Sequence, residues 1–224
     1  METVNEINDI EKLNDNEIIG KPQLDNSEII FLGKGNILYC EGNVVLSDTS
    51  IRFSGNNSVI YLSDTESSYF LNLLILNNSI IFIGKNNIFY PIVNISIPDN
   101  YKLIMGCDGV IESNVTLGNV HDFEVIDLSS KENLFENRSI YIGDYVAICS
   151  SSHISNGVEI GSGAILNSGA HVPQERSLKS NAIYGGNPCV PIKKNVTFVK
   201  NSDEVNDEII KFVFNEGETL SPEK

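Results

Sequence analysis

The sequence has few basic residues. Its 15 Lys and Arg are outnumbered by 30 Asp and Glu, which gives a formal net charge of −15 at pH 7. General affinity for nucleic acid or for an anionic membrane surface requires a basic surface. The charge balance therefore argues against nucleic acid as a partner, although it leaves room for a small local basic site.

Cysteine is scarce, and the four cysteines form no CxxC pair. The ligand spacing of a zinc site is missing, so we expect no metal. We interpret the four as reduced, buried or half-buried thiols of a cytoplasmic protein. They are Cys40, Cys107, Cys149 and Cys189.

The sequence also lacks a long uninterrupted apolar run. Residues 1–15 are acidic and have no apolar core, so no signal peptide is predicted. The most apolar stretch, residues 70–97, is interrupted by asparagines and a lysine. It cannot cross a bilayer, so we expect no membrane insertion and a cytoplasmic location.

What the sequence does contain is an internal repeat. Six large aliphatic residues recur at a spacing of six, and small or β-branched residues follow the first five of them four positions later. Neither a helix of 3.6 residues per turn nor an alternating strand has that period. A triangular coil does, because each hexapeptide supplies one short strand and one corner and three hexapeptides close a turn. The two sets are Ile142, Ile148, Ile154, Ile160, Leu166 and Val172, and Val146, Ser152, Val158, Ala164 and Ala170.

Upstream the repeat is looser. Apolar clumps recur about every seven residues between positions 37 and 97, and Asn and Gly lie between them, where sharp corners need them. Met105, Ile111 and Leu117 restore the period of six. The alternative is a chance pattern in a β-sandwich, against which eleven matching positions in a row argue. The sequence thus predicts an all-β, parallel β-helix.

The register of the repeat slips once. The separation between Leu117 and Ile142 is not a multiple of six, so a loop is predicted near 119–138. We divide the chain into an acidic N-terminal arm (1–26), a β-helix domain (27–199) and a C-terminal helix and tail (200–224). The C-terminal segment is expected to cap the stack or to contact a neighbouring chain.

Residues 139–197 resemble the C-terminal half of the hexapeptide-repeat acetyltransferases, especially the bacterial polysaccharide and sugar O-acetyltransferases. The stretches IYIGDYV and NGVEIGSGAILNSGA are similar to their coils, and YGGNPCVPIKK is similar to their closing loop. NVHDFEVIDLSSKENLFENRSIYIG resembles the loop that precedes the next coil. The resemblance implies a left-handed β-helix, a homotrimer with sites between subunits, acetyl-CoA as co-substrate and a glycan or sugar acceptor.

The loop contains the candidate catalytic residues. A neutral imidazole can remove the proton of an acceptor hydroxyl, and His121 lies among carboxylates that could fix its tautomer. Asp127 is similar in position to the family's orienting Asp, with Asp122 and Glu124 as rivals. The alternative for His121 is an ordinary loop histidine in a solvated acidic neighbourhood. The resemblance implies direct transfer in a ternary complex.

Other positions are assigned to ligands by the same resemblance. It places the cofactor against Asn167, Ser168, Gly186, Asn187, Pro188, Lys193 and Lys194. Asn119 and Tyr145 are expected on the acceptor side, with Tyr145 in place of an aromatic residue that the family commonly has two positions later. His153 and His171 precede inward aliphatic residues, so we expect both to point outward.

Three functions remain open from the sequence. The first is an O-acetyltransferase acting on a sugar hydroxyl of a bacterial surface polysaccharide such as a capsule, because the long N-terminal stack suits an extended acceptor. The second is an acetyltransferase for a free sugar, nucleotide sugar or amino acid. The third is a non-catalytic β-helix used in binding or assembly, which would have no affinity for acetyl-CoA.

Overall fold

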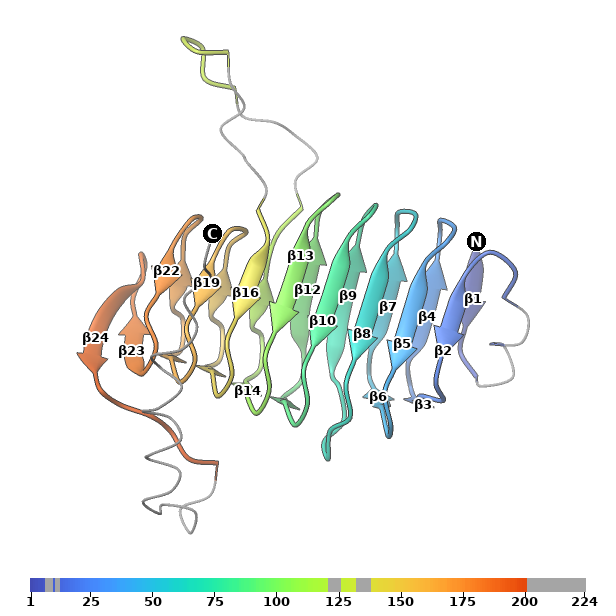
Figure 1. Cartoon of the computed structure of the whole chain (residues 1–224), viewed down its shortest axis with the longest axis horizontal. Coiled ribbons are helices and arrows are strands. Elements are labelled where there is room, and N and C mark those ends of the chain that lie inside the picture. The colour runs from blue at the N-terminus through green and yellow to red at the C-terminus, as the bar shows by residue number, and fades with distance from the viewer. Residues whose placement is uncertain (7–9, 11–12, 121–125, 132–137, 201–224) are drawn as a thin grey trace, which may run out of the picture.

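The structure is a computed structural model that describes residues 1–6, 10, 13–120, 126–131 and 138–200. The expected C-terminal helix over 200–224 falls almost entirely outside these ranges. The described residues form one stack of coils whose strands build three long faces, as Figure 1 shows. None of them forms an apolar helix of membrane-spanning length.

Sheet A forms the first face. Its strands, in spatial order, are β1 (Glu2–Val4), β4 (Glu28–Phe31), β7 (Ser50–Phe53), β9 (Leu71–Ile75), β12 (Val93–Ile97), β15 (Thr116–Leu117), β18 (His153–Ile154) and β21 (His171–Val172).

Sheet B forms the second face. It comprises β2 (Glu17–Ile19), β5 (Ile37–Cys40), β8 (Val59–Leu62), β10 (Ile80–Ile83), β13 (Lys102–Met105), β16 (Ile140–Ile142), β19 (Glu159–Ile160) and β22 (Ser177–Leu178).

The third face is divided. A two-stranded sheet C holds β3 (Gln23–Asp25) and β6 (Val45–Ser47), and sheet D holds β11 (Ile88–Phe89), β14 (Val110–Ile111), β17 (Ala147–Ile148), β20 (Ile165–Leu166), β23 (Ala182–Gly185) and β24 (Val190–Lys194).

Strand pairing is parallel except at two ends of the stack. β1 pairs antiparallel with β4, and β24 pairs antiparallel with β23. Each of these strands covers an edge that would otherwise offer unpaired backbone groups to another chain. Part of segment 1–26, expected as an acidic arm, therefore belongs to the stack, because Ile18 buries its side chain in β2 and Leu24 packs against the core from β3.

The core confirms the hexapeptide prediction. The six aliphatic residues from Ile142 to Val172 are at most 4% exposed, and the small residues between them are at most 1% exposed. Inward residues from the three faces meet in one continuous apolar column along the axis of the stack. Burial of that column, at roughly 25 cal/mol per Å² of apolar surface, supplies the main stabilisation of the fold.

Two coil lengths explain the change of period along the chain. In the N-terminal part a coil advances the chain by 22 positions, as between Asn36 and Ser58, or by 21, as between Ser58 and Ser79. In the C-terminal part it advances by 18, as between Asp144 and Ser162. The longer coils have strands of up to five residues on sheets A and B, whereas most strands of the shorter coils have two. The looser upstream repeat is thus a regular but longer coil.

Asparagine side chains bind the backbone at the corners of the longer coils. Asn87 is 1% exposed, and its Nδ2 donates to the carbonyl oxygens of Gly84 and Gly106 at 2.8 Å each. Its Oδ1 accepts from the backbone N–H of Gly109 at 2.7 Å. The side chain therefore satisfies three backbone groups that turn away from the strand ladders.

Candidate functional site

The inserted loop is visible in the strand register. β13 pairs with β16, and the backbone N–H of Cys107, just after β13, donates to Oδ1 of Asp144, which lies 37 positions later. An uninterrupted coil in this half of the chain spans only 18 positions. The excess is the inserted segment. The chain leaves sheet A after β15 and enters sheet B at β16, so the loop begins and ends at the corner between these two faces (Figure 1). We call this position the A–B corner.

The outgoing end of the loop is fixed to the next coil. The backbone N–H of Asn119 donates to Oδ1 of Asn156 at 3.3 Å, and Nδ2 of Asn156 donates to the carbonyl oxygen of Asn119 at 2.9 Å. Asn156 is 1% exposed. Asn119, assigned to the acceptor side from the sequence, therefore lies at the A–B corner, two residues before His121.

The returning end of the loop is fixed as well. Arg138 places Nη2 at 3.3 Å from Oε1 of Glu175, and its carbonyl oxygen accepts from the N–H of Gly157 at 3.1 Å. About half of each charged side chain is exposed, so the ion pair contributes little to stability. These contacts place the loop's return beside the next two coils.

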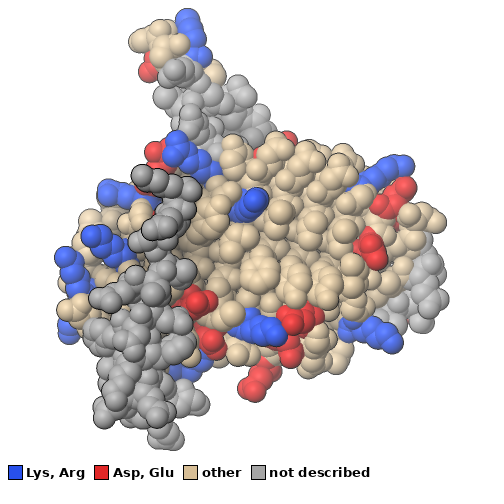
Figure 2. Space-filling model, in the orientation of Figure 1, with Lys and Arg blue, Asp and Glu red and all other residues tan. Residues whose placement is uncertain are grey.

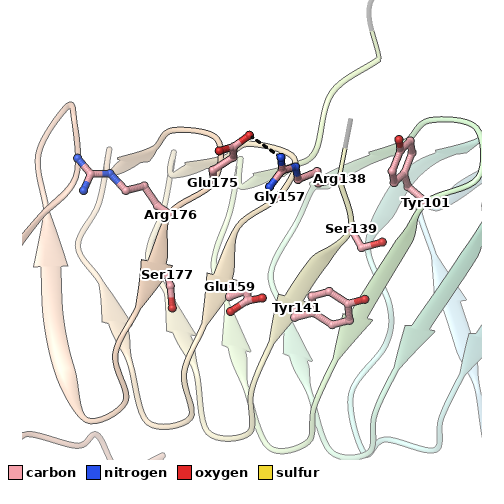
Figure 3. Close-up of a pocket in the computed structure, with 9 residues that line it drawn as sticks. All are labelled: Tyr101, Arg138, Ser139, Tyr141, Gly157, Glu159, Glu175, Arg176 and Ser177. Atoms are coloured by element: carbon pink, nitrogen blue, oxygen red, sulfur yellow. Dashed lines mark ion pairs between the residues drawn. The ribbon is translucent and has the colours of Figure 1, made fainter. Parts of the chain in front are cut away.

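An open cavity of about 470 Å³ lies against the returning end of the loop, on the sheet B side of the A–B corner (Figure 3). Hydroxyl, carboxylate and guanidinium groups line it together with two tyrosine rings, a set that suits a polar ligand with apolar faces. The lining residues are Tyr101, Arg138, Ser139, Tyr141, Gly157, Glu159, Glu175, Arg176 and Ser177.

Two histidines lie on the sheet A side of the same coils. His153 and His171 are paired in register, and their rings stack with centroids 5.1 Å apart and an angle of 9° between planes. Both are half-buried on the outer face, as predicted. Burial lowers the pKa of His153, and the charge of His171 lowers it further.

The candidate base, His121, lies outside the described residues, as do its neighbours Asp122 and Glu124. Asp127 is described, in the segment 126–131 that stands away from the coils in Figure 1. Its Oδ1 accepts from the backbone N–H groups of Ser129 and Ser130 at 2.7 and 2.8 Å. These hydrogen bonds lower the pKa of the Asp127 carboxyl, which favours its charged form.

The residues predicted to bind cofactor gather at the corner between sheets D and A. Asn167 and Ser168 are exposed between β20 and β21, and Gly186, Asn187 and Pro188 are exposed between β23 and β24. The segment 186–189 is held against β21, because the N–H of His171 donates to Gly186 O at 3.0 Å and the N–H of Cys189 donates to His171 O at 2.7 Å.

The predicted lysines are placed on a different element. Lys193 and Lys194 are exposed on β24, opposite Ile183 and Ala182 of β23. Tyr145 lies at the corner between sheets B and D, with its N–H bonded to Cys107 O at 2.9 Å. Within one chain, Tyr145 and Asn119 therefore lie at the two ends of β16 rather than together.

Most of the cavity was not predicted from the sequence. Arg138 and Glu175 come from coils on either side of Gly157, where a Cβ would lie 3.0 Å from that of Arg138. The feature of the sequence that could have predicted part of the cavity was the coil length, because a repeat of 18 positions places Tyr141, Glu159 and Ser177 in one column.

No metal site is found among the described residues. They contain no cluster of three metal-binding side chains. All four cysteines are free thiols, two of them buried.

The parallel faces and the 18-residue coils define a parallel β-helix of hexapeptide repeats, and this β-helix is left-handed. This is the fold that the sequence predicted. No family model matches the chain.

Comparisons with known proteins confirm the resemblance to hexapeptide-repeat acetyltransferases. The chain is 32% identical over 114 residues to the galactoside O-acetyltransferase of Escherichia coli (strain K12). The match covers 51% of this chain and 54% of that protein, so it spans about half the length of each.

Two solved structures share the fold. The polySia-specific acetyltransferase NeuO aligns with a TM-score of 0.79 at 22% identity, covering 92% of this chain and 95% of that chain. The polysialic acid O-acetyltransferase OatWY aligns with a TM-score of 0.74 at 18% identity, covering 87% of this chain and 92% of that chain. At these identities the likeness establishes the architecture.

Proposed function

We propose that the chain is an O-acetyltransferase that moves an acetyl group from acetyl-CoA to a sugar hydroxyl of a bacterial surface polysaccharide. The observation that carries the proposal is the sequence match to a galactoside O-acetyltransferase on this fold. The two similar structures are acetyltransferases of polysialic acid, which supports a polymeric sugar acceptor.

His121 is the general base of the proposed reaction. It follows Asn119 by two residues, so the two Cα atoms lie within about 7 Å of one another. Asn119 is bonded to Asn156, and the next residue, Gly157, lines the cavity. The cavity, which can hold a sugar in this proposal, therefore adjoins the coil to which the chain is bonded two residues before His121.

The acetyl group passes directly from acetyl-CoA to the acceptor within a ternary complex in this proposal, with no acyl-enzyme. His121 takes the proton of the acceptor hydroxyl while the hydroxyl oxygen attacks the thioester carbonyl of acetyl-CoA. The C–S bond then breaks, CoA leaves as the thiolate, and the imidazolium returns the proton to it. General base catalysis of this kind contributes roughly 10²–10⁴-fold, and Asp127 orients the ring in this proposal.

The cofactor lies along the D–A corner in this proposal, against Asn167, Ser168 and the segment 186–188, with Lys193 and Lys194 meeting its phosphates as point charges. The enzyme acts in the cytoplasm as a homotrimer. The D–A and A–B corners bound opposite edges of sheet A, so the cofactor corner and the acceptor cavity of one chain lie apart. In the trimer, the cofactor corner of one subunit is therefore brought to the acceptor cavity of its neighbour.

Thiol release from acetyl-CoA tests the proposal. The acceptor is an oligosaccharide prepared from the surface glycan, and wild type is compared with His121→Ala and with His153→Ala as the matched control. Thiol release that depends on the glycan and is lost only in His121→Ala supports both the acetyltransferase activity and the role of His121 as general base. Release only with free sugars would change the acceptor class. Absence of both release and acetyl-CoA binding would leave a non-catalytic β-helix.

A further inference from the structure

Sheet B carries an outward column of apolar and aromatic side chains. In register along the stack, its apolar and aromatic part is Ile19, Tyr39, Tyr61, Phe82, Ile104 and Tyr141, and the column continues into the polar Glu159 and Ser177. A second outward column begins at Glu17, continues through the apolar Ile37, Val59 and Ile80, and reaches Lys102. Figure 2 shows this face as largely uncharged over β5, β8 and β10, on a chain whose net charge is −15.

This apolar strip is not a general feature of outward faces. On the neighbouring strands of sheet A, one outward column is Ser50, Asn72, Asn94 and Thr116, and the other is Ile30, Arg52, Leu74 and Ser96, so polar residues predominate and no aromatic ring is present. Both sheets face inward with the same kind of aliphatic residue. The coil therefore does not require an apolar outer face, and the strip on sheet B calls for an explanation of its own.

The rings of the strip hold one another in place. Tyr39 and Tyr61 stack with centroids 4.7 Å apart and 6° between planes, and Tyr61 and Phe82 stack at 5.1 Å and 26°. The Tyr61 hydroxyl bonds Glu41 at the edge of the strip, and Lys85 neutralises that carboxylate at 2.9 Å. A ligand that binds to these fixed rings immobilises few side chains, so the entropic cost of binding is low.

The column leads directly into the cavity at the A–B corner. Its last three members, Tyr141, Glu159 and Ser177, are cavity-lining residues, and Tyr141 is 44% exposed. Lys102 of the second column also reaches the cavity wall, because its N–H donates to Oγ of Ser139 at 3.1 Å. Strip and cavity are therefore one continuous surface.

The dimensions of the strip fit a single polymer chain. From Tyr39 to Tyr141 there are four steps between strands, or about 19 Å at about 4.8 Å each, and the two columns are about 7 Å apart along a strand. A stable protein interface buries about 800 Å² on each partner, several times the area of such a strip. A linear glycan is long and narrow, and its sugars combine apolar C–H faces with hydroxyls.

We propose that the sheet B strip binds the polysaccharide acceptor as an extended chain, holding the sugars beyond the reacting unit. This inference rests on the proposed function. Ring edges and aliphatic side chains contact the C–H faces, and the tyrosine hydroxyls hydrogen-bond the sugar hydroxyls. The longer N-terminal coils thus serve as an acceptor platform.

The test measures kcat/KM for acceptor oligosaccharides of increasing length. In wild type, kcat/KM rises with length until the strip is filled. Tyr61→Ser/Phe82→Ser lowers kcat/KM about tenfold or more for long acceptors, corresponding to about 1.4 kcal/mol or more of lost binding, and leaves the shortest acceptor unchanged. Tyr61→Leu/Phe82→Leu keeps an apolar surface without the stacked rings and guards against a folding defect. Asn72→Ser/Asn94→Ser, on sheet A, is the matched control and retains the length dependence.

The outcomes separate this inference from the proposed function. No transfer by wild type to any acceptor contradicts the proposed function itself. Transfer that is independent of length, or whose length dependence survives both double variants, overturns the acceptor strip alone. Light scattering is measured on every variant. A fall in oligomer mass in the sheet B variants shows that the strip is a contact between copies of the chain, which also overturns the inference.

Discussion

The side chain of Asn156 bonds both backbone polar groups of Asn119, accepting from its N–H at 3.3 Å and donating to its carbonyl oxygen at 2.9 Å. The two residues are 37 positions apart and belong to successive coils of the stack. Through this pair the start of the inserted loop is fixed to the β-helix two residues before His121.

Replacement of Asn156 should therefore affect catalysis more than its stability effect explains. In Asn156→Ala we expect kcat to fall about 10- to 100-fold, since a misplacement of about 1 Å can cost that much. The KM for acetyl-CoA should stay unchanged. Asn156→Asp keeps the acceptor for the Asn119 N–H and should recover part of the activity. Equal kcat in wild type and Asn156→Ala would show that the bond does not position the base.

The matched control is another buried asparagine, Asn87, which is far from the loop along the chain. Asn87→Ala leaves the N–H of Gly109 and the carbonyls of Gly84 and Gly106 without their partner. We expect a loss of about 2–4 kcal/mol in the free energy of unfolding with kcat retained. Urea unfolding measures the loss, and exposed Asn72→Ala should change stability by less than about 0.5 kcal/mol. Similar unfolding curves for the two variants would contradict the prediction.

Close packing between coils gives a second stability prediction. A Cβ on Gly106 would contact the carboxylate of Asp144 and lie 2.8 Å from its backbone nitrogen, whereas a Cβ on Gly169 would meet nothing within 4 Å. Gly106→Ala should destabilise the fold by about 3 kcal/mol. Gly169→Ala should cost only about 1–2 kcal/mol, because its φ of +70° strains any side chain. Thermal unfolding of the two variants side by side measures which is less stable. A lower Tm for Gly169→Ala than for Gly106→Ala would contradict the prediction.

The stacked histidines predict a sensitivity to acid. The pKa of His153 is lowered from its usual 6.5 in the folded protein, so the unfolded chain takes up this proton first as the pH falls. The contribution of His153 to stability is thus complete above about pH 6.5 and is lost as the pH falls through the lowered pKa. His153→Asn should show a smaller fall in Tm between pH 7.5 and pH 5 than wild type. His171→Asn should show an intermediate fall, because burial rather than His171 is the main cause of the shift. Parallel Tm curves for wild type and His153→Asn would contradict this.

The sequence was sufficient to predict the fold because every inward position of the short coils is set by the same steric demand. The aliphatic residue of each hexapeptide fills the axis, as Ile148 does, and the small residue fits the corner, as Ala164 does. The longer N-terminal coils were harder to recognise, because strands of four or five residues alternate inward and outward positions and blur a single period.

The candidate site was predicted only in part. The loop and its corner follow from the broken period, but the cavity depends on which side chains of successive coils lie above one another, and that is set by the length of each coil. The contact of Arg138 with Glu175 and the pairing of His153 with His171 both depend on it. Likewise, the outward strip on sheet B became recognisable only once Tyr39, Tyr61 and Phe82 were placed in one register.

The change in coil length divides the stack into a broad half and a narrow half. In the broad half, two of the three faces carry strands of up to five residues, and each coil holds its neighbour with many ladder bonds, whereas most strands in the narrow half have two residues. Local opening should therefore start among the two-residue strands of the narrow half, where the hydrogen bonds between coils are fewest. The proposed cofactor corner belongs to the narrow half, so small movements there can accompany substrate entry. The broad coils meanwhile provide a rigid surface that holds the polymer.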